Sequence, residues 1–526
     1  MLKTTSLSRI AQRSLRPCRL PRRCLSSGPK PPVKPDNSTQ NVSFIGEQFA
    51  QNSAVAINYF KQFIKYTAVG LAVVGVTTWT ALESAHMWVE KKELIPDNDP
   101  EVHKWEWDLE AERWTGGPSG GTDPGLGFKG RHAVRSAWAA QEWGIGSSGS
   151  VIGSSAYSSK GSTGGLSVVE ARLEFAQDFL NIAIQIALKR EPSGKLRPET
   201  VRELLQRHAS VMEHMGTREA LFEARSEFER VWSMLPGKGI DAARTALKIG
   251  DLNRRLGDNE EALAWWARAI QLTQDKDARV PIEIPPPVPQ AMPSSPLAQR
   301  TLLSTLVSLS AYHATSGQLR QAQKVEEESL NLIRSVRQPE SLDVVTPPQA
   351  LHALYILHRS SLLSIHLAEV LYALRKKPTS SIEWLTRAAE SSERVAFTLT
   401  GRPLTHPDAP QSKIPHPPDS ETPLLPAYDK SNTLRKPARS LLRDSRRSAA
   451  EAWTLMGILA ETSSAPDAKQ RALEYYERAL GWAGVSGDRA GGIGQPGEGT
   501  LEAEWNALWN KYVRVRNSIK EKEGSS

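Results

Sequence analysis

Cysteine is almost absent from this chain of 526 residues. Its two cysteines, Cys18 and Cys24, both lie in the strongly basic first part of the sequence. If that part is removed from the mature protein, no thiol remains. Disulfide bonds, thiolate metal sites and cysteine nucleophiles are then excluded.

Acidic residues are missing from the first 35 positions, where arginines recur every three or four residues with serine and leucine between them. A cationic, acid-free leader is typical of a mitochondrial transit peptide. A secretory signal needs a continuous apolar core, and none occurs before residue 55. The stretch Arg23 to Ser26 is similar to a matrix processing site. We expect residues 1–25 to be a transit peptide and residues 26–65 a basic, matrix-side segment; a disordered basic tail is the alternative.

The net charge of +8 is also distributed unevenly along the chain. Residues 1–65 carry eleven lysines and arginines against two acids, so the rest of the chain is close to neutral. Because the basicity belongs to the leader, it gives no support to a nucleic-acid-binding surface. No nucleic-acid partner is expected.

One long stretch without charge stands out, Tyr66–Leu82. Its 17 residues reach the short end of the length that crosses a bilayer as a helix. Lysines at 61 and 65 precede it and Glu83 follows it, which favours a membrane span over a buried core helix. The basic flank should stay on the matrix side. We therefore expect a single-pass protein of the mitochondrial inner membrane, with most of the chain in the intermembrane space.

Catalytic motifs are lacking. The chain has no HExxH pair and no Gly-Lys-Ser/Thr phosphate loop. Residues 125–130 fit GxGxxG, but neither the preceding strand nor the following acid of a nucleotide site is present. Histidines such as His208 and His352 have no acid placed with them at metal-ligand spacing. We expect a binding protein and not an enzyme, with no cofactor and no metal.

Tryptophan is concentrated near the expected span, since residues 79–143 hold seven of the fifteen. Residues 83–143 either form a small tryptophan-packed hairpin of helices or provide a docking surface at the membrane face. Residues 144–166, rich in glycine and serine, are expected to be a flexible linker that separates this segment from the rest.

From residue 167 onward the apolar period is helical, with no convincing strand pattern. Proline-rich stretches at 281–296 and 403–426 should be loops, because no helix continues through them. We expect a helical domain over residues 167–516, followed by a tail at 517–526.

Within this domain, one pair of expected helices meets at Gly257. Gly250, Ala262 and Ala269 are small where the two helices must approach, and Trp266 is bulky beside them. This pattern resembles the small-small-bulky-small positions of the tetratricopeptide repeat (TPR) family. The resemblance implies an all-α fold, a TPR-like helical-repeat (α-solenoid) domain preceded by a single transmembrane helix.

A second unit near the C-terminus carries the same positions, at Gly457, Ala472, Tyr476 and Ala479. A unit around Gly317 is degenerate, because Glu326 stands where the aromatic residue is expected. Another lies around Tyr372 and Ala388. Several stacked units of this kind bury a continuous core and leave a groove lined by first helices.

Such grooves bind peptides or partner helices, so other proteins are the expected partners. In the best unit the groove positions are Arg244, Leu247, Asp251 and Arg254. The lysine and asparagine that capture chaperone C-termini in some TPR proteins are absent, since Leu247 and Asp251 stand in their places.

In architecture the chain resembles the inner-membrane adaptor subunits of the mitochondrial i-AAA protease, which present substrates to that protease. The resemblance implies an adaptor in protein quality control. An assembly factor for a respiratory complex, or a membrane anchor for mitochondrial translation with the repeats in the matrix, are the alternatives.

Overall fold

The computed structural model describes residues 44–144, 151–153, 168–237, 239–274, 283–339, 342, 344–401, 424–463, 465–483, 485–488, 492–496 and 502–524. The expected transit peptide, its processing site and the first part of the basic segment lie outside these residues. The chain divides into two compact units, Met1–Trp79 and Thr80–Ser526.

The described part of the first unit is a single helix, which belongs to α1 (Phe44–Trp88). In the described chain, α1 with its continuation to Glu93 is long and apolar enough to cross a membrane. None of its apolar window is buried in the protein, and Val73 and Trp79 are each 58% exposed. A helix of the protein core would bury such side chains.

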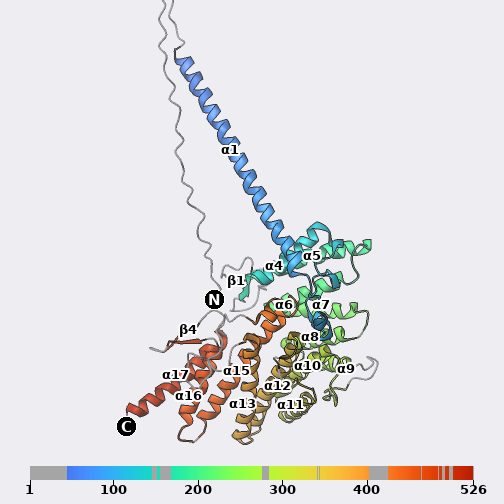
Figure 1. Ribbon diagram of the computed structural model, residues 1–526, viewed down its shortest axis with the longest axis vertical. Helices are drawn as coiled ribbons and strands as arrows, with labels where there is room; N and C mark the ends of the chain where they lie inside the picture. The colour runs from blue at the N-terminus through green and yellow to red at the C-terminus, as the bar shows by residue number, and fades with distance from the viewer. Residues whose placement is uncertain are drawn as a thin grey trace, which may run out of the picture. The chain divides into compact units, whose positions relative to one another are not determined.

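The second unit is a series of helical hairpins that follow one another along the chain (Figure 1). The hairpins are α4–α5, α6–α7, α8–α9, α10–α11, α12–α13 and α15–α16, and α17 packs on α16. Their helices are α4 (Gly127–Trp143), α5 (Ala171–Arg190), α6 (Thr200–Met215), α7 (Arg218–Met234), α8 (Ile240–Leu256), α9 (Asn259–Thr273), α10 (Pro296–Thr315), α11 (Leu319–Arg334), α12 (Pro347–Ala373), α13 (Pro378–Thr400), α15 (Arg435–Glu461), α16 (Ala468–Trp482) and α17 (Glu502–Gly524). This is the expected all-α, TPR-like repeat architecture.

Shorter elements connect these helices. They are η1 (Val89–Glu93), α2 (Pro100–Lys104), α3 (Trp107–Glu110), η2 (Gly117–Ser119), η3 (Pro124–Leu126), η4 (Glu191–Ser193) and α14 (Pro426–Asp429). Four short strands, which the sequence did not predict, form two antiparallel pairs: β1 (Val151–Gly153) with β2 (Val168–Glu170), and β3 (Val485–Asp488) with β4 (Gly492–Pro496).

Local sequence explains where the helices begin and end. Gly257 ends α8 with a φ of +96°, a conformation that residues with a side chain rarely adopt. Ser295 caps α10 by accepting a hydrogen bond from the Ala298 amide, and Pro296 occupies the first turn. The proline-rich loop therefore ends one residue before the expected boundary at 296.

Two expected boundaries differ from the structure. Helix α4 packs on α5, and both contribute to one hydrophobic cluster with α6, α7 and α8. The repeat array thus includes α4, and the glycine- and serine-rich stretch does not divide two packing units. At the other end α17 continues to Gly524, so residues 517–524 are helical and not a separate tail.

Candidate functional site

One segment of the chain contacts the first helix of five successive hairpins. We call residues 97–114, which include α2 and α3, the strap. Its contacts lie on α6, α8, α10, α12 and α15, and we call the side of the array that these helices share the first-helix face. The tryptophan-rich segment is therefore neither an isolated hairpin nor a free surface in this stretch.

Arg300 on α10 and Trp107 of the strap form the centre of this interface. Both residues are 1% exposed, and the guanidinium lies 3.8 Å from the centroid of the indole ring. Arg300 also donates to the Glu110 carboxylate at 2.6 Å and to two strap carbonyl oxygens. The Trp107 indole donates to the Pro348 carbonyl at the start of α12, at 2.9 Å. The buried charge of Arg300 is stable here because its N–H groups donate to strap oxygens and its flat face lies on the indole ring.

Carboxylates attach the rest of the strap. Glu112 accepts an ion pair from Arg207 on α6 at 2.7 Å and another from Lys436 on α15 at 2.6 Å. Burial raises the pKa of Glu112, but the charges of Arg207 and Lys436 outweigh it and lower the pKa to about 2. At the other end, Asp97 accepts hydrogen bonds from the amides of Asn432 and Thr433. The strap thus joins α6, in the second hairpin of the array, to α15 in the last.

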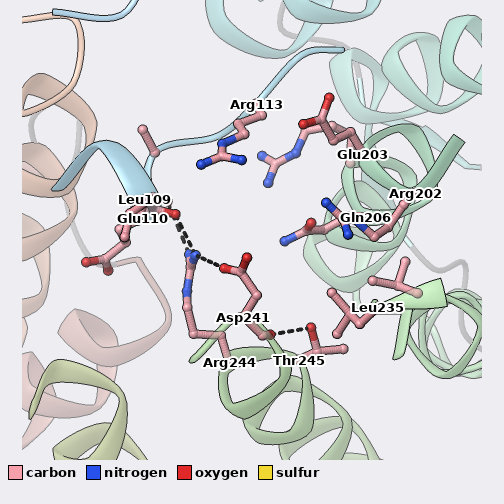
Figure 2. Close-up of a pocket in the computed structure, with 13 residues that line it drawn as sticks. Leu109, Glu110, Arg113, Arg202, Glu203, Gln206, Leu235, Asp241, Arg244 and Thr245 are labelled. Carbon is pink, nitrogen blue, oxygen red and sulfur yellow. Dashed lines mark hydrogen bonds and ion pairs between the residues drawn. The ribbon is translucent and has the colours of Figure 1, made fainter. Parts of the chain in front are cut away.

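Of the predicted groove residues, Arg244 contacts the strap. It donates to the carbonyl oxygens of Leu109 and Glu110, at 2.8 and 3.2 Å, as Figure 2 shows. Burial lowers the pKa of Arg244, although the carboxylates of Glu110 and Asp241 oppose that effect. The guanidinium remains charged over the physiological range.

The other three predicted groove residues make contacts within the array. Leu247 is half-buried against the core formed by α9 to α12. Asp251 accepts from the Trp266 indole at 3.1 Å, and burial raises its pKa against a hydrogen bond from Ser308. Arg254 donates to Thr315 on α10 at 3.3 Å. These side chains join neighbouring hairpins, and only part of each reaches solvent.

The residues predicted to make the TPR-like contacts are placed as that pattern requires. A Cβ atom on Gly250 would lie 2.6 Å from the Trp266 ring, and one on Gly457 would collide with the Tyr476 ring. The paired helices can approach only because neither glycine has a side chain. The remaining positions are fully buried: Ala262, Trp266, Ala269, Ala472, Tyr476 and Ala479.

The degenerate unit replaces the aromatic side chain by a buried carboxyl. Glu326 is fully buried and one of its oxygens accepts from Ser310 at 2.8 Å. Burial raises its pKa to about 8, and the charges of Glu369 and Glu327 act in the same direction. The carboxyl is therefore protonated at neutral pH, which a buried position without a cation requires.

A small cavity of about 50 Å³ lies between the strap, α6 and α8. Figure 2 shows Arg113 from the strap, Gln206 from α6 and Arg244 from α8 converging on it. Glu203, also in its wall, is 4% exposed, and its oxygens have no hydrogen-bond partner among the described residues. Burial raises the pKa of Glu203 against nearby arginines. A larger pocket of about 480 Å³ lies beside Trp105, Met292 and His352.

The histidines singled out in the sequence are in structural surroundings. His208 is fully buried and its Nδ1 lies 2.7 Å from a Glu227 oxygen; with Glu223 these residues could geometrically hold a metal ion. Burial lowers the pKa of His352 and of His358 to about 3, so both are neutral at physiological pH. The glycines of the GxGxxG stretch accommodate neighbours, because a Cβ on Gly125 would meet the Lys195 carbonyl.

Sequence reasoning missed the strap. Its one visible signal is the alternation of tryptophan with acid in residues 105–114, opposite first helices that carry arginine and lysine. That pattern suits an extended segment held on a basic face, but it also suits a short exposed helix.

Comparison with models of known protein families gives no match, and comparison with curated proteins gives no match either.

Proposed function

We propose that this chain is a membrane-anchored, TPR-like adaptor that binds protein partners on its first-helix face and catalyses no reaction. The observation that carries the proposal is the strap itself. It is an acidic, tryptophan-bearing segment held by arginines and a lysine on four first helices and by a backbone carbonyl on a fifth, α12. The face that holds one such segment has the chemistry to hold another, since charge-assisted hydrogen bonds and buried tryptophans supply affinity in peptide recognition.

The anchor is proposed to lie in the mitochondrial inner membrane. Support comes from the acid-free arginine-rich leader and from the exposed apolar length of α1. The repeat array is proposed to face the intermembrane space, and the positive flank before the span supports this orientation. By its architecture, the adaptor would present membrane substrates to an i-AAA-type protease. This last step rests on architectural resemblance alone.

The strap contacts the N-terminal parts of α8, α10 and α12, so the partner is proposed to bind further along these helices. Leu247, Asp251 and Arg254 lie in that part of α8 and are partly accessible. They combine an apolar side chain with both signs of charge, which suits an amphipathic helix or an extended peptide.

Site-specific photo-crosslinking in intact mitochondria tests this proposal. A photoreactive residue at Arg254 should crosslink to the i-AAA protease or its membrane substrates. The matched control is the same residue at Lys324, whose side chain is 74% exposed on the second helix α11. Crosslinks of equal strength from both positions, or to none of these proteins, would contradict partner binding on the first-helix face.

A further inference from the structure

The start of α4 and the end of α5 form an exposed edge that is both apolar and basic. We call Phe128, Lys129, Leu188, Lys189 and Arg190 the basic-aromatic edge. Phe128 is 58% and Leu188 40% exposed, and the three cationic residues are exposed as well. Exposed apolar side chains grouped with charged residues are typical of sites that bind a ligand or a surface.

Contacts between the two helices bring Arg190 to the residues that precede Phe128. Arg190 Nη1 donates to the Gly125 carbonyl at 2.9 Å, and a Cβ on Gly127 would collide with the Arg190 guanidinium. The end of α5 therefore lies directly against the residues that precede Phe128. Lys195 is also exposed just beyond, and its carbonyl oxygen lies where a Cβ on Gly125 would be.

The edge is also tied to the residue that follows the apolar run of α1. The Phe128 ring lies 3.9 Å from the His132 ring, and His132 Nε2 lies 2.8 Å from a Glu83 carboxylate oxygen. The His86 ring packs on the same histidine at 4.5 Å. Glu83 is the first charged residue after Tyr66–Leu82, and all these contacts lie within the unit that begins at Thr80. One histidine, His132, thus connects Phe128 to Glu83, the residue directly after the apolar run.

The charges of the edge are not neutralised within the array. Among the described residues, Lys129 and Lys189 have no ion pair or hydrogen bond, and Arg190 pairs with a backbone carbonyl and not with an acid. Glu191 is the exposed acid nearest in sequence, and Glu83 is paired with His132. An exposed aromatic ring and unneutralised lysines on adjoining helix ends are the chemistry that binds the anionic headgroup layer of a bilayer.

We propose that the basic-aromatic edge lies in the headgroup layer next to the membrane span and binds anionic phospholipid. The array is then held to the bilayer at two points, the span and the edge. The inference requires α1 to span a membrane and is independent of which protein the adaptor binds.

Depth-dependent fluorescence quenching tests the proposal in the full chain. A variant with Cys18→Ser and Cys24→Ser receives one labelled cysteine at Pro124, which is exposed beside the edge. It is reconstituted in phosphatidylcholine vesicles, with or without about one fifth phosphatidylglycerol, and quenched by headgroup-region spin-labelled lipid. The label should be quenched in both, and at least about twofold more strongly with the anionic lipid.

Reversing the charges of the edge lysines distinguishes binding of anionic lipid from mere proximity of the edge to the bilayer. Lys129→Glu with Lys189→Glu should abolish the increase caused by phosphatidylglycerol. The matched control, Lys324→Glu with Lys376→Glu, reverses two exposed lysines elsewhere and should leave the increase intact. An increase that survives the edge variant would overturn the proposal.

Val73 lies near the middle of Tyr66–Leu82, so a label there is read with lipid that carries its spin label deep in the acyl chain, and it reports on the span independently. Quenching at Val73 without quenching at Pro124 would overturn the basic-aromatic edge and leave membrane anchoring intact. If neither position is quenched, α1 is not inserted, and both the edge and the membrane anchor of the proposed adaptor are wrong.

Discussion

Two glycines show how single residues set the distance between paired helices. Gly250 faces the Trp266 ring and Gly457 faces the Tyr476 ring, so each hairpin packs an aromatic ring directly on backbone. The helices cannot separate to admit a methyl group without losing contacts along their whole length.

Gly250→Ala should therefore lower the free energy of unfolding by about 1–3 kcal/mol, the usual cost of overpacking a core. Thermal and denaturant melts of the purified protein measure it. The matched control is Gly237→Ala, because a Cβ there meets no atom within 4 Å. Equal melting temperatures for the two variants would show that the ring contact does not limit helix approach.

Glu326 gives the array a pH dependence. Its pKa rises from 4.5 to about 8 on folding, chiefly through burial. Across that window the unfolded chain loses the proton and the folded chain keeps it, so the contribution of this residue to stability falls as pH rises. Above about pH 8 the loss is complete.

Glu326→Gln, which carries no charge at any pH, should remove this contribution. Its melting temperature relative to the parent should increase from about pH 5 to about pH 8 and then level off. Glu328→Gln, exposed on the same helix, serves as the control and should show no such trend. A constant difference between Glu326→Gln and the parent would mean that the buried carboxyl does not titrate in this range.

Among the elements, the strap matters most for the function proposed. It contributes Val102 and Trp107 to a hydrophobic cluster with α12, α13 and α15, and its carboxylates pair with first helices. It is therefore part of the core of the array and not a loose surface loop.

Trp107→Ala should release the strap while the hairpins remain folded. The cost of truncating a buried tryptophan is about 3–5 kcal/mol, which corresponds to a loss of hydrogen-exchange protection of about a hundredfold or more in residues 97–114. Hydrogen exchange read by mass spectrometry measures this segment separately from the hairpins. Trp143→Ala, where the ring is 43% exposed, is the control. Unchanged protection of the strap in Trp107→Ala would show that its ion pairs suffice to hold it.

At the scale of the whole molecule, the functional proposal depends on the membrane and its sidedness. The protein should stay in the membrane fraction after carbonate extraction, because the exposed apolar helix has no other place to bury its side chains. In mitoplasts, added protease should digest residues after 83. Protection of the array with the inner membrane intact would place it in the matrix and favour the translation-anchor alternative.

The expected transit peptide, residues 1–25, can be tested separately. If the protein is imported into mitochondria as proposed, N-terminal sequencing of the mature chain should find that it begins near Ser26, because Arg23 lies two residues before Leu25, the apolar residue that precedes the expected cut. A mature chain that still begins at Met1 would contradict the transit peptide and remove the main support for a mitochondrial location.

The sequence by itself determined the features that depend on neighbouring residues. Helical periodicity, the turn at Gly257 and the spacing of Gly250 to Trp266 all lie within a single hairpin, so local pattern was sufficient to predict the repeat fold. The apolar run of α1 could also be predicted from local sequence, because the ability of a helix to cross a membrane depends on its length and composition.

Only the tertiary structure decided what lies on the first-helix face. Arg300 meets Glu110 across 190 residues, and Lys436 meets Glu112 across 324. No local period encodes such pairs, and a charged residue at a groove position looks the same in sequence whether it faces solvent or another part of the chain. Arg244 was predicted to be a partner-binding residue, and its contact with the strap became visible only once the helices were stacked. The physical reason is that burial of a charge is set by its partner, and here the partner is distant in sequence.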